Sequence, residues 1–400
     1  MENNNQIRFI DFEGKIKSED YFTLQLKLFN FIGCDLIKKK SSTQKYKIFS
    51  ILKTIQFLAC ATNVILFMIT LFTRTIMDIQ NIAIIVKVLP NAINIPYNFF
   101  SKYVLINIRR QKVLKLFKNL KQFFPTTKFD QKKYKIETQI NQFIKALYYY
   151  SICYFLLVSS TTVYSAYLLF FHKIRKPLIE IWFPFDDLEN NLIFIITSLW
   201  IALSGGICCL VLIACDWTIF AFVNILAIAF DMFGEELKFA INQEDEKSVR
   251  NLIKKHKKLI AIFDEISEIF SLTFLCSFFV GAASVSVSGF QLATSNDLGE
   301  ITYSIPYTLG SLSQIFLYCY FGQRIIDSTY GVSKNINESN WILLKNFKLK
   351  KMISMISQRS QKLNSLIAYG FVVLNLETFS MIMSSAFSYF TLLKNLYFKN

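Results

Sequence analysis

The chain has little of the chemistry that enzymes and metal sites use. Only two histidines occur among its 400 residues, and neither His172 nor His256 has a metal-binding or hydrolase spacing. No glycine-rich motif of the kind that cradles phosphates is present among the 12 glycines. We therefore expect no catalytic residues, no metal and no cofactor, and a protein that is not an enzyme.

Cysteines are rare outside the apolar stretches, and acidic residues are fewer than basic ones. The eight cysteines fall in or beside apolar stretches apart from Cys34, which excludes an extracellular disulfide framework. Acidic residues number 28 against 44 basic ones, a net charge of +16. Because the basic residues are spread over four loops, attraction to anionic membrane lipid is favoured over nucleic acid as the explanation.

Apolar residues dominate what is there. Hydrophobic residues make up 53% of the chain and charged residues only 18%, which leaves too little polar surface for a soluble protein of this length. Seven stretches are long enough to cross a bilayer: 48–72, 82–106, 144–171, 192–213, 266–290, 301–323 and 366–391. The sequence predicts an all-α membrane protein with seven transmembrane helices.

The distribution of lysine and arginine predicts the orientation. The loops on the amino-terminal side carry 34 of these residues and the opposite loops six, and cytoplasmic loops hold the excess. We expect a cytoplasmic amino terminus and an extracellular carboxyl terminus. The apolar run after Leu192 continues almost to Phe230. If it held two spans joined at Gly205 and Gly206, the chain would have eight spans, and the basic residues would be divided almost equally between the two sides. Seven spans is the better interpretation, with the fourth helix running on below the membrane.

One polar line runs down the last apolar stretch. Its members are three or four residues apart and so share one face of a helix: Glu377, Ser380, Ser384, Ser388, Thr391 and Asn395. Hydrocarbon offers no hydrogen bonds, so this face must meet other helices or water. A water-lined pore and a packing seam of small residues both fit the pattern.

The carboxyl-terminal region resembles a known family. Residues 359–396 are similar to the signature of insect odorant receptors, above all in Gln361-Lys362, in Leu376-Glu377-Thr378-Phe379 and in the run from Ser388 to Leu393. The segments 318–322 and 338–341 also resemble that family. Leu363 and Val373 stand where the family has prolines, and Tyr369 where it has a glycine.

The resemblance implies an odorant-gated cation channel, a tetramer with a central pore that the last helix of each subunit lines. It also implies that cytoplasmic helical extensions form an anchor. The expected organisation is a cytoplasmic segment 1–47, six membrane helices over 48–323, anchor helices over 324–365, and a pore helix with a short tail over 366–400. The pore and gate residues would be Glu377, Ser384, Ser388, Thr391, Leu392, Asn395 and Leu396, with the two leucines forming an apolar gate around Asn395.

Within that family the chain resembles the ligand-tuning subunits. The shared co-receptor has a long insertion before the fifth span, and residues 214–265 leave no space for it. The resemblance thus implies a heterotetramer with the odorant co-receptor, in the plasma membrane of a sensory neuron dendrite. A gustatory-type receptor channel, a metabotropic seven-helix receptor and a transporter or membrane enzyme remain the alternatives, separable by topology and by internal repeats.

A ligand pocket for a small volatile organic molecule is expected in the outer halves of spans two to six, because such sites combine aromatic and a few polar groups. The same side chains also suit packing or interfacial anchoring. The candidates are Val88, Asn91, Ser160, Tyr164, Trp200, Ser204, Phe290, Tyr303 and Tyr307.

Overall fold

The computed structural model describes residues 18–33, 44–80, 82–125, 128–177, 179–185, 188–361 and 365–399. In these ranges the chain is helical apart from short connections and one hairpin. The α-helices are α1 (Ser18–Phe31), α2 (Gln44–Met77), α3 (Ile82–Tyr97), α4 (Leu105–Ile108), α5 (Arg110–Lys121), α6 (Lys128–Lys133), α7 (Ile136–Tyr167), α8 (Asn191–Asn242), α9 (Glu246–Thr294), α10 (Leu298–Asn337), α11 (Phe347–Gln361) and α12 (Leu376–Lys399). Two π-helical segments, η1 (Asn98–Val104) and η2 (Leu168–His172), extend α3 and α7, and a 3₁₀ turn, η3 (Asn340–Leu343), precedes α11.

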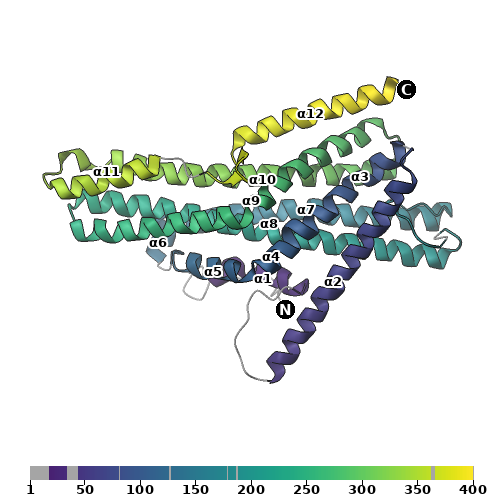
Figure 1. The fold of residues 1–400 in the computed structure, drawn as a ribbon, viewed down its shortest axis with the longest axis horizontal. Helices are drawn as coiled ribbons and strands as arrows, with labels where there is room; N and C mark the ends of the chain where they lie inside the picture. Colours follow the sequence, from purple (N-terminus) through teal and green to yellow (C-terminus); the bar gives the residue numbers. More distant parts are fainter. Residues whose placement is uncertain are drawn as a thin grey trace, which may run out of the picture.

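Three very long helices, α8, α9 and α10, run along the molecule and pack against one another (Figure 1). The 52 residues of α8 span about 78 Å, more than twice the thickness of the hydrocarbon core. The helix is continuous through Gly205 and Gly206, and nearly every side chain from Val211 to Phe230 is buried. The expected continuation of the fourth helix past Ile213 is confirmed, and its second half is the apolar centre of a helical bundle.

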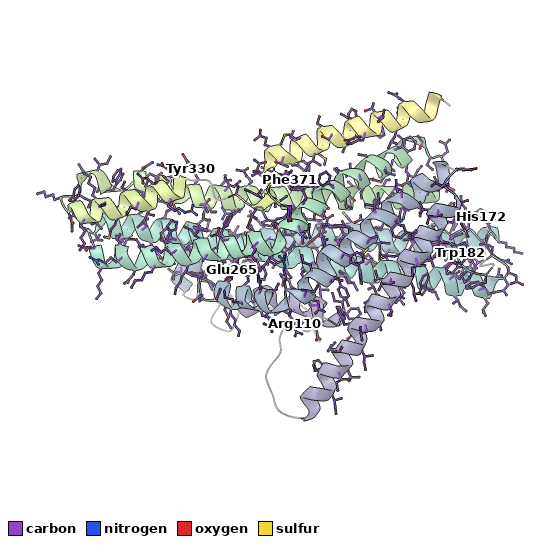
Figure 2. The ribbon with its side chains drawn as sticks, in the orientation of Figure 1. Arg110, His172, Trp182, Glu265, Tyr330 and Phe371 are labelled. Carbon is purple, nitrogen blue, oxygen red and sulfur yellow. The ribbon has the colours of Figure 1, made fainter. Side chains whose placement is uncertain are left out.

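Figure 2 places His172 and Trp182, in and beside the connection between α7 and α8, at one end, and Tyr330 on α10 towards the other. Among the described residues, four helices are long and apolar enough to cross a membrane: α2, α7 with η2, α8 and α9. The other three expected spans lie on α3, which passes into a π-helical turn after Tyr97, and on α10 and α12, which carry polar side chains along their length.

The last membrane helix begins ten residues later than predicted. The sequence interpretation placed a span over 366–391, whereas residues 367–373 form a hairpin of β1 (Ile367–Ala368) and β2 (Val372–Val373). The chain reverses because Tyr369 and Gly370 adopt positive φ angles of 48° and 80°. Asn375 then caps α12, its side chain accepting a hydrogen bond from the backbone N–H of Thr378 at 2.8 Å.

Candidate functional site

A cavity of about 70 Å³ lies among α2, α3, α7, α8 and α10, enough space for several water molecules or a small ligand. Its wall is mostly apolar, with side chains that include Phe67, Ile95, Leu157, Val158, Ile201 and Leu212. Asn91, Asn94, Asn98, Tyr303 and Tyr307 contribute the polar groups. A mainly apolar wall with a few convergent polar groups is typical of a site for a small organic molecule.

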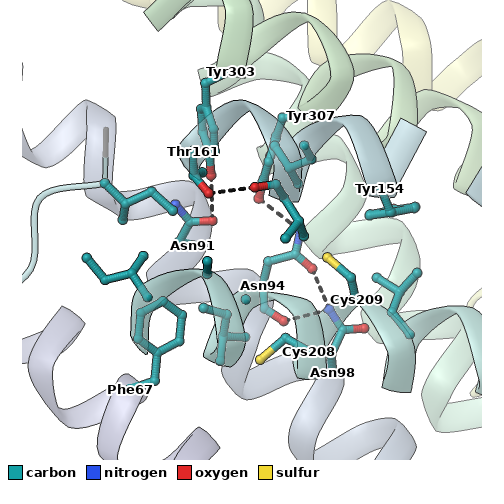
Figure 3. Close-up of a pocket in the computed structure, with 18 residues that line it drawn as sticks. Phe67, Asn91, Asn94, Asn98, Tyr154, Thr161, Cys208, Cys209, Tyr303 and Tyr307 are labelled. Carbon is teal, nitrogen blue, oxygen red and sulfur yellow. Dashed lines mark hydrogen bonds between the residues drawn. The ribbon is translucent and has the colours of Figure 1, made fainter. Parts of the chain in front are cut away.

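The polar side of the cavity is a hydrogen-bonded set between α3 and α10. Asn91, Asn94 and Asn98 are three and four residues apart, so they share one face of α3 and its π-helical extension. The Tyr303 hydroxyl donates to Asn91 Oδ1, and Asn94 Nδ2 donates to the Tyr307 oxygen, both at 2.9 Å (Figure 3). These bonds fix the side chains of Asn91 and Asn94 in the cavity wall.

Two of those polar atoms have no hydrogen-bond partner within the part of the chain that the structure describes. They are Asn91 Nδ2, a donor, and Asn98 Oδ1, an acceptor, and both atoms are buried. A buried polar group without a partner costs about 1–3 kcal/mol, so each one in a native protein calls for an explanation. A ligand that offers a complementary acceptor or donor would satisfy them.

Three of the nine predicted ligand residues, Asn91, Tyr303 and Tyr307, line this cavity. The other six do not: Val88, Ser160, Tyr164, Trp200, Ser204 and Phe290. The hydroxyl of Ser160 donates to its own helix at the Leu157 carbonyl, 2.8 Å away, and Trp200 packs edge-on against Phe67 with ring centroids 5.7 Å apart.

For three of these six residues, an immediate neighbour in sequence lines the cavity instead. Thr161 lines the cavity in place of Ser160, Ile201 in place of Trp200, and Gly205 in place of Ser204. One residue along an α-helix is a rotation of about 100°. The predicted candidates therefore lie at the depth of this cavity, but three of them lie one position away from the residues of α7 and α8 that line it. Sequence reasoning also missed Asn94 and Asn98, although three amides at helical spacing in an apolar span are a readable signal.

A buried ion pair lies beside this cavity. Lys102 Nζ is 2.5 Å from Asp216 Oδ1, and neither side chain is exposed to solvent. The Tyr150 hydroxyl and Gln314 Nε2 donate to the second carboxylate oxygen at 2.5 and 2.8 Å, and the Tyr318 hydroxyl donates to the first at 2.7 Å. These four donors use the four lone-pair positions of the carboxylate, two on each oxygen.

This Asp216 network joins the cavity to the core of the long helices. Lys102 lies on η1, Tyr150 on α7, Asp216 on α8 and Tyr318 on α10. The ring of Tyr150 packs edge-on against Tyr154, which lines the cavity, with centroids 5.1 Å apart. Tyr154 and Tyr150 thus form a continuous line of contacts between the cavity wall and the ion pair.

The outer side of the cavity is covered by the connection between α7 and α8. Ile179 from this connection lines the cavity, and the adjacent Glu180 pairs with Arg74 of α2 at 3.0 Å. Lys176, in the same connection, pairs with Asp297 at the start of α10 at 2.5 Å. These pairs hold the connection against α2 and the start of α10.

The pair between Asp297 and Lys176 should be insensitive to pH between 5 and 8. Hydrogen bonds from the Lys176 ammonium and the Tyr164 hydroxyl lower the pKa of the carboxyl from its usual 3.8 to about 2. A carboxyl with a depressed pKa stabilises the fold at pH values above its ordinary pKa, and this contribution is lost only as the pH falls towards 2.

We expect Asp297→Asn to lower the melting temperature of the purified receptor by the same small amount at every pH from 5 to 8, because a half-exposed pair contributes about 1 kcal/mol or less. A difference that disappears by pH 5 would contradict the depressed pKa.

The polar line on α12 faces away from the rest of the chain. Glu377, Ser384, Ser388 and Asn395 are exposed and Thr391 is half-buried, whereas Ala386, on the opposite side of the helix, is buried. The hydroxyl of Ser286 on α9 donates to the Ala386 carbonyl at 3.1 Å. Leu392 is 55% exposed, and the side chain of Leu396 lies outside the described residues. Within one chain the polar line is therefore not a packing seam against any described residue.

Comparison with known proteins decides the family. Residues 81–387 match the family described as 7tm Odorant receptor. The chain belongs to this family. It is an odorant receptor, a multi-pass membrane protein and not an enzyme, as the carboxyl-terminal resemblance indicated.

Individual relatives agree with this family. Putative odorant receptor 92a of Drosophila melanogaster is 25% identical over 73% of this chain and 74% of its own, and odorant receptor 67c of the same species is 22% identical over 82% and 84%. The insect olfactory receptor OR5 from Machilis hrabei, solved in complex with eugenol, matches with a TM-score of 0.81 at 16% identity, over 94% of this chain and 100% of that one. The structural match confirms the seven-helix, all-α membrane fold.

Proposed function

We propose that this odorant receptor binds a small, mainly apolar volatile molecule in the cavity between α3 and α10. The observation that carries the proposal is an apolar wall with one unpartnered amide donor, Asn91 Nδ2, and one unpartnered amide acceptor, Asn98 Oδ1. A ketone, ester, ether or alcohol offers an oxygen to the first, and an alcohol also offers a donor to the second. A pure hydrocarbon would leave both atoms unsatisfied.

Ligand binding would open a non-selective cation channel formed together with the odorant co-receptor. The exposed polar line of α12 supports this mechanism, because an intramembrane polar face needs water or a partner chain. In this assembly residues 1–47 and 324–365 would lie in the cytoplasm, the latter as anchor helices, and the tail after α12 outside. The heterotetramer would lie in the plasma membrane of a sensory dendrite, with permeating cations and membrane lipid as its other partners.

Substitution of Asn91 tests the ligand site. In cells that also express the co-receptor, Asn91→Leu should raise the half-maximal concentration of an oxygen-bearing ligand about tenfold, which corresponds to one lost hydrogen bond. Ligands without oxygen should change by less than about threefold. The measurement is odour-evoked current across a panel of volatiles matched in carbon skeleton.

Ser160→Ala is the matched control, because the Ser160 hydroxyl is bonded to its own helix and does not line the cavity. It should leave both dose–response curves unchanged. Equal shifts for Asn91→Leu and Ser160→Ala would show that the cavity is not the odorant site.

A further inference from the structure

A second recess, with a volume of about 350 Å³, opens between α7, α8 and α10. Aromatic side chains form one part of its lining and hydrogen-bonding side chains another. The residues that matter are Phe143, Phe316 and Tyr320 in the first group and Gln139, Gln142 and Arg324 in the second. No aspartate or glutamate lines it among the described residues.

The recess lies almost one bilayer thickness along α10 from the cavity. Arg324 follows Tyr307, which lines the odorant cavity, by 17 residues on α10, a distance of about 25 Å along the helix. The hydrocarbon core is about 30 Å thick, so a group this far from the cavity is near the headgroups of the other leaflet. Tyr148 and Tyr149, on the same helix as Gln142, are 62% and 66% exposed, as expected for tyrosines at a membrane interface.

The polar part of the recess centres on one guanidinium, which neighbouring acceptors occupy only in part. Arg324 Nη2 is 2.7 Å from Asp231 Oδ2 and 3.3 Å from Gln139 Oε1. Among the described residues both acceptors use Nη2, which leaves the N–H groups of Nε and Nη1 for a ligand. Lys145 is exposed three residues after Gln142 and so adds positive charge on the same side of α7.

The aromatic part is an exposed surface. The rings of Phe316 and Tyr320 stack with centroids 6.0 Å apart and are 42% and 46% exposed. Phe316 also packs edge-on against Phe379 in the first turn of α12, with centroids 5.5 Å apart. A molecule bound on this surface would contact Phe316, which itself contacts the first turn of α12.

We propose that this recess binds an anionic phospholipid of the cytoplasmic leaflet. The phosphate accepts hydrogen bonds from Arg324 and from the Gln142 amide, and an acyl chain lies along Phe316 and Tyr320. Guanidinium and amide donors suit a phosphate, and the adjoining stacked rings suit a chain, so an amphiphile fits where a free phosphate would leave the aromatic surface uncovered. Through Phe316 and Phe379 the bound lipid braces the first turn of α12. That consequence for gating rests on the proposed channel function, whereas lipid binding itself does not.

Photolabelling of the full-length receptor in its membrane tests the site. Photoreactive phosphatidylserine should label peptides covering 139–149 and 316–324 at least fivefold more than photoreactive phosphatidylcholine, as mapped by mass spectrometry. Gln142→Glu places a carboxylate beside the phosphate and should lower the phosphatidylserine adducts at least fivefold. Gln142→Asn, the matched control, should keep them. Gln142 is exposed, so both variants should reach the surface equally.

Several outcomes would overturn the proposal. Equal labelling by the two lipids, or labelling that Gln142→Glu leaves unchanged, would mean that only unspecific boundary lipid covers the recess. Loss of the adducts to competition by soluble glycerophosphoserine would mean that the headgroup alone is recognised and the acyl chain is not. None of these readouts uses channel current, so failure here is distinguishable from failure of the proposed function.

Discussion

Lys102→Met should remove most of the receptor from the cell surface. The substitution leaves the Asp216 carboxylate buried without its ammonium partner, 2.5 Å away in the native protein. Breaking a buried pair by removing one partner costs about 3–5 kcal/mol. Protein domains have a total stability of about 5–15 kcal/mol, so a loss of this size depletes the folded state. Surface biotinylation and the melting temperature of the purified receptor would measure it.

Two further variants separate the buried charge from the loss of a side chain. Lys102→Met combined with Asp216→Asn removes both charges while an amide remains for Tyr150, Gln314 and Tyr318, and it should restore much of the surface level. Lys112→Met is the matched control, because Lys112 and Glu268 form an exposed pair at 2.8 Å that contributes little. Normal surface levels for Lys102→Met alone would show that the Asp216 network does not depend on its ion pair.

The sequence predicts the large features of this fold because they follow from length and periodicity. The apolar run after Leu192 indicates one helix longer than a membrane, and the structure has it as α8. The three-and-four spacing from Glu377 to Asn395 predicts a polar helical face, and that face is exposed. Both depend on residues close together in the chain, which is what a periodic pattern encodes.

The missed features depend on long-range contacts or on local backbone geometry. Lys102 and Asp216 are each visible as a charge in or near an apolar stretch, but they are 114 residues apart, and no pattern pairs them. Likewise, no sequence pattern predicts the π-helical turn η1, which contains Lys102. Of the missed features, the hairpin before α12 has the clearest sequence signal, since Gly370 is a common turn residue, although its neighbour Tyr369 is not.

Cysteine substitutions along α12 should give a periodic pattern if its polar face lines water. In heteromers with the co-receptor, cysteines at Ser388 and Asn395 should react with small charged thiol reagents and lose at least half of the odour-evoked current, and Thr391 should follow to a lesser extent. A cysteine at Phe390 should change little, because that ring points towards Gly289 of α9, where an added Cβ would lie 3.8 Å from it. Whole-cell recording before and after reagent measures the loss.

The receptor without added cysteines sets the baseline, because all seven cysteines in the part of the chain that the structure describes are free. A flat profile from 384 to 395 would instead mean that the polar face packs against a neighbouring subunit.

The gate gives an independent test of the same face. If Leu392 helps to close the pore by excluding water, Leu392→Ser should raise the current without odorant severalfold, since a polar side chain makes a dry constriction wettable. A normal resting current in Leu392→Ser, together with reactive cysteines at Ser388 and Asn395, would keep α12 as the pore helix and move the constriction elsewhere along it.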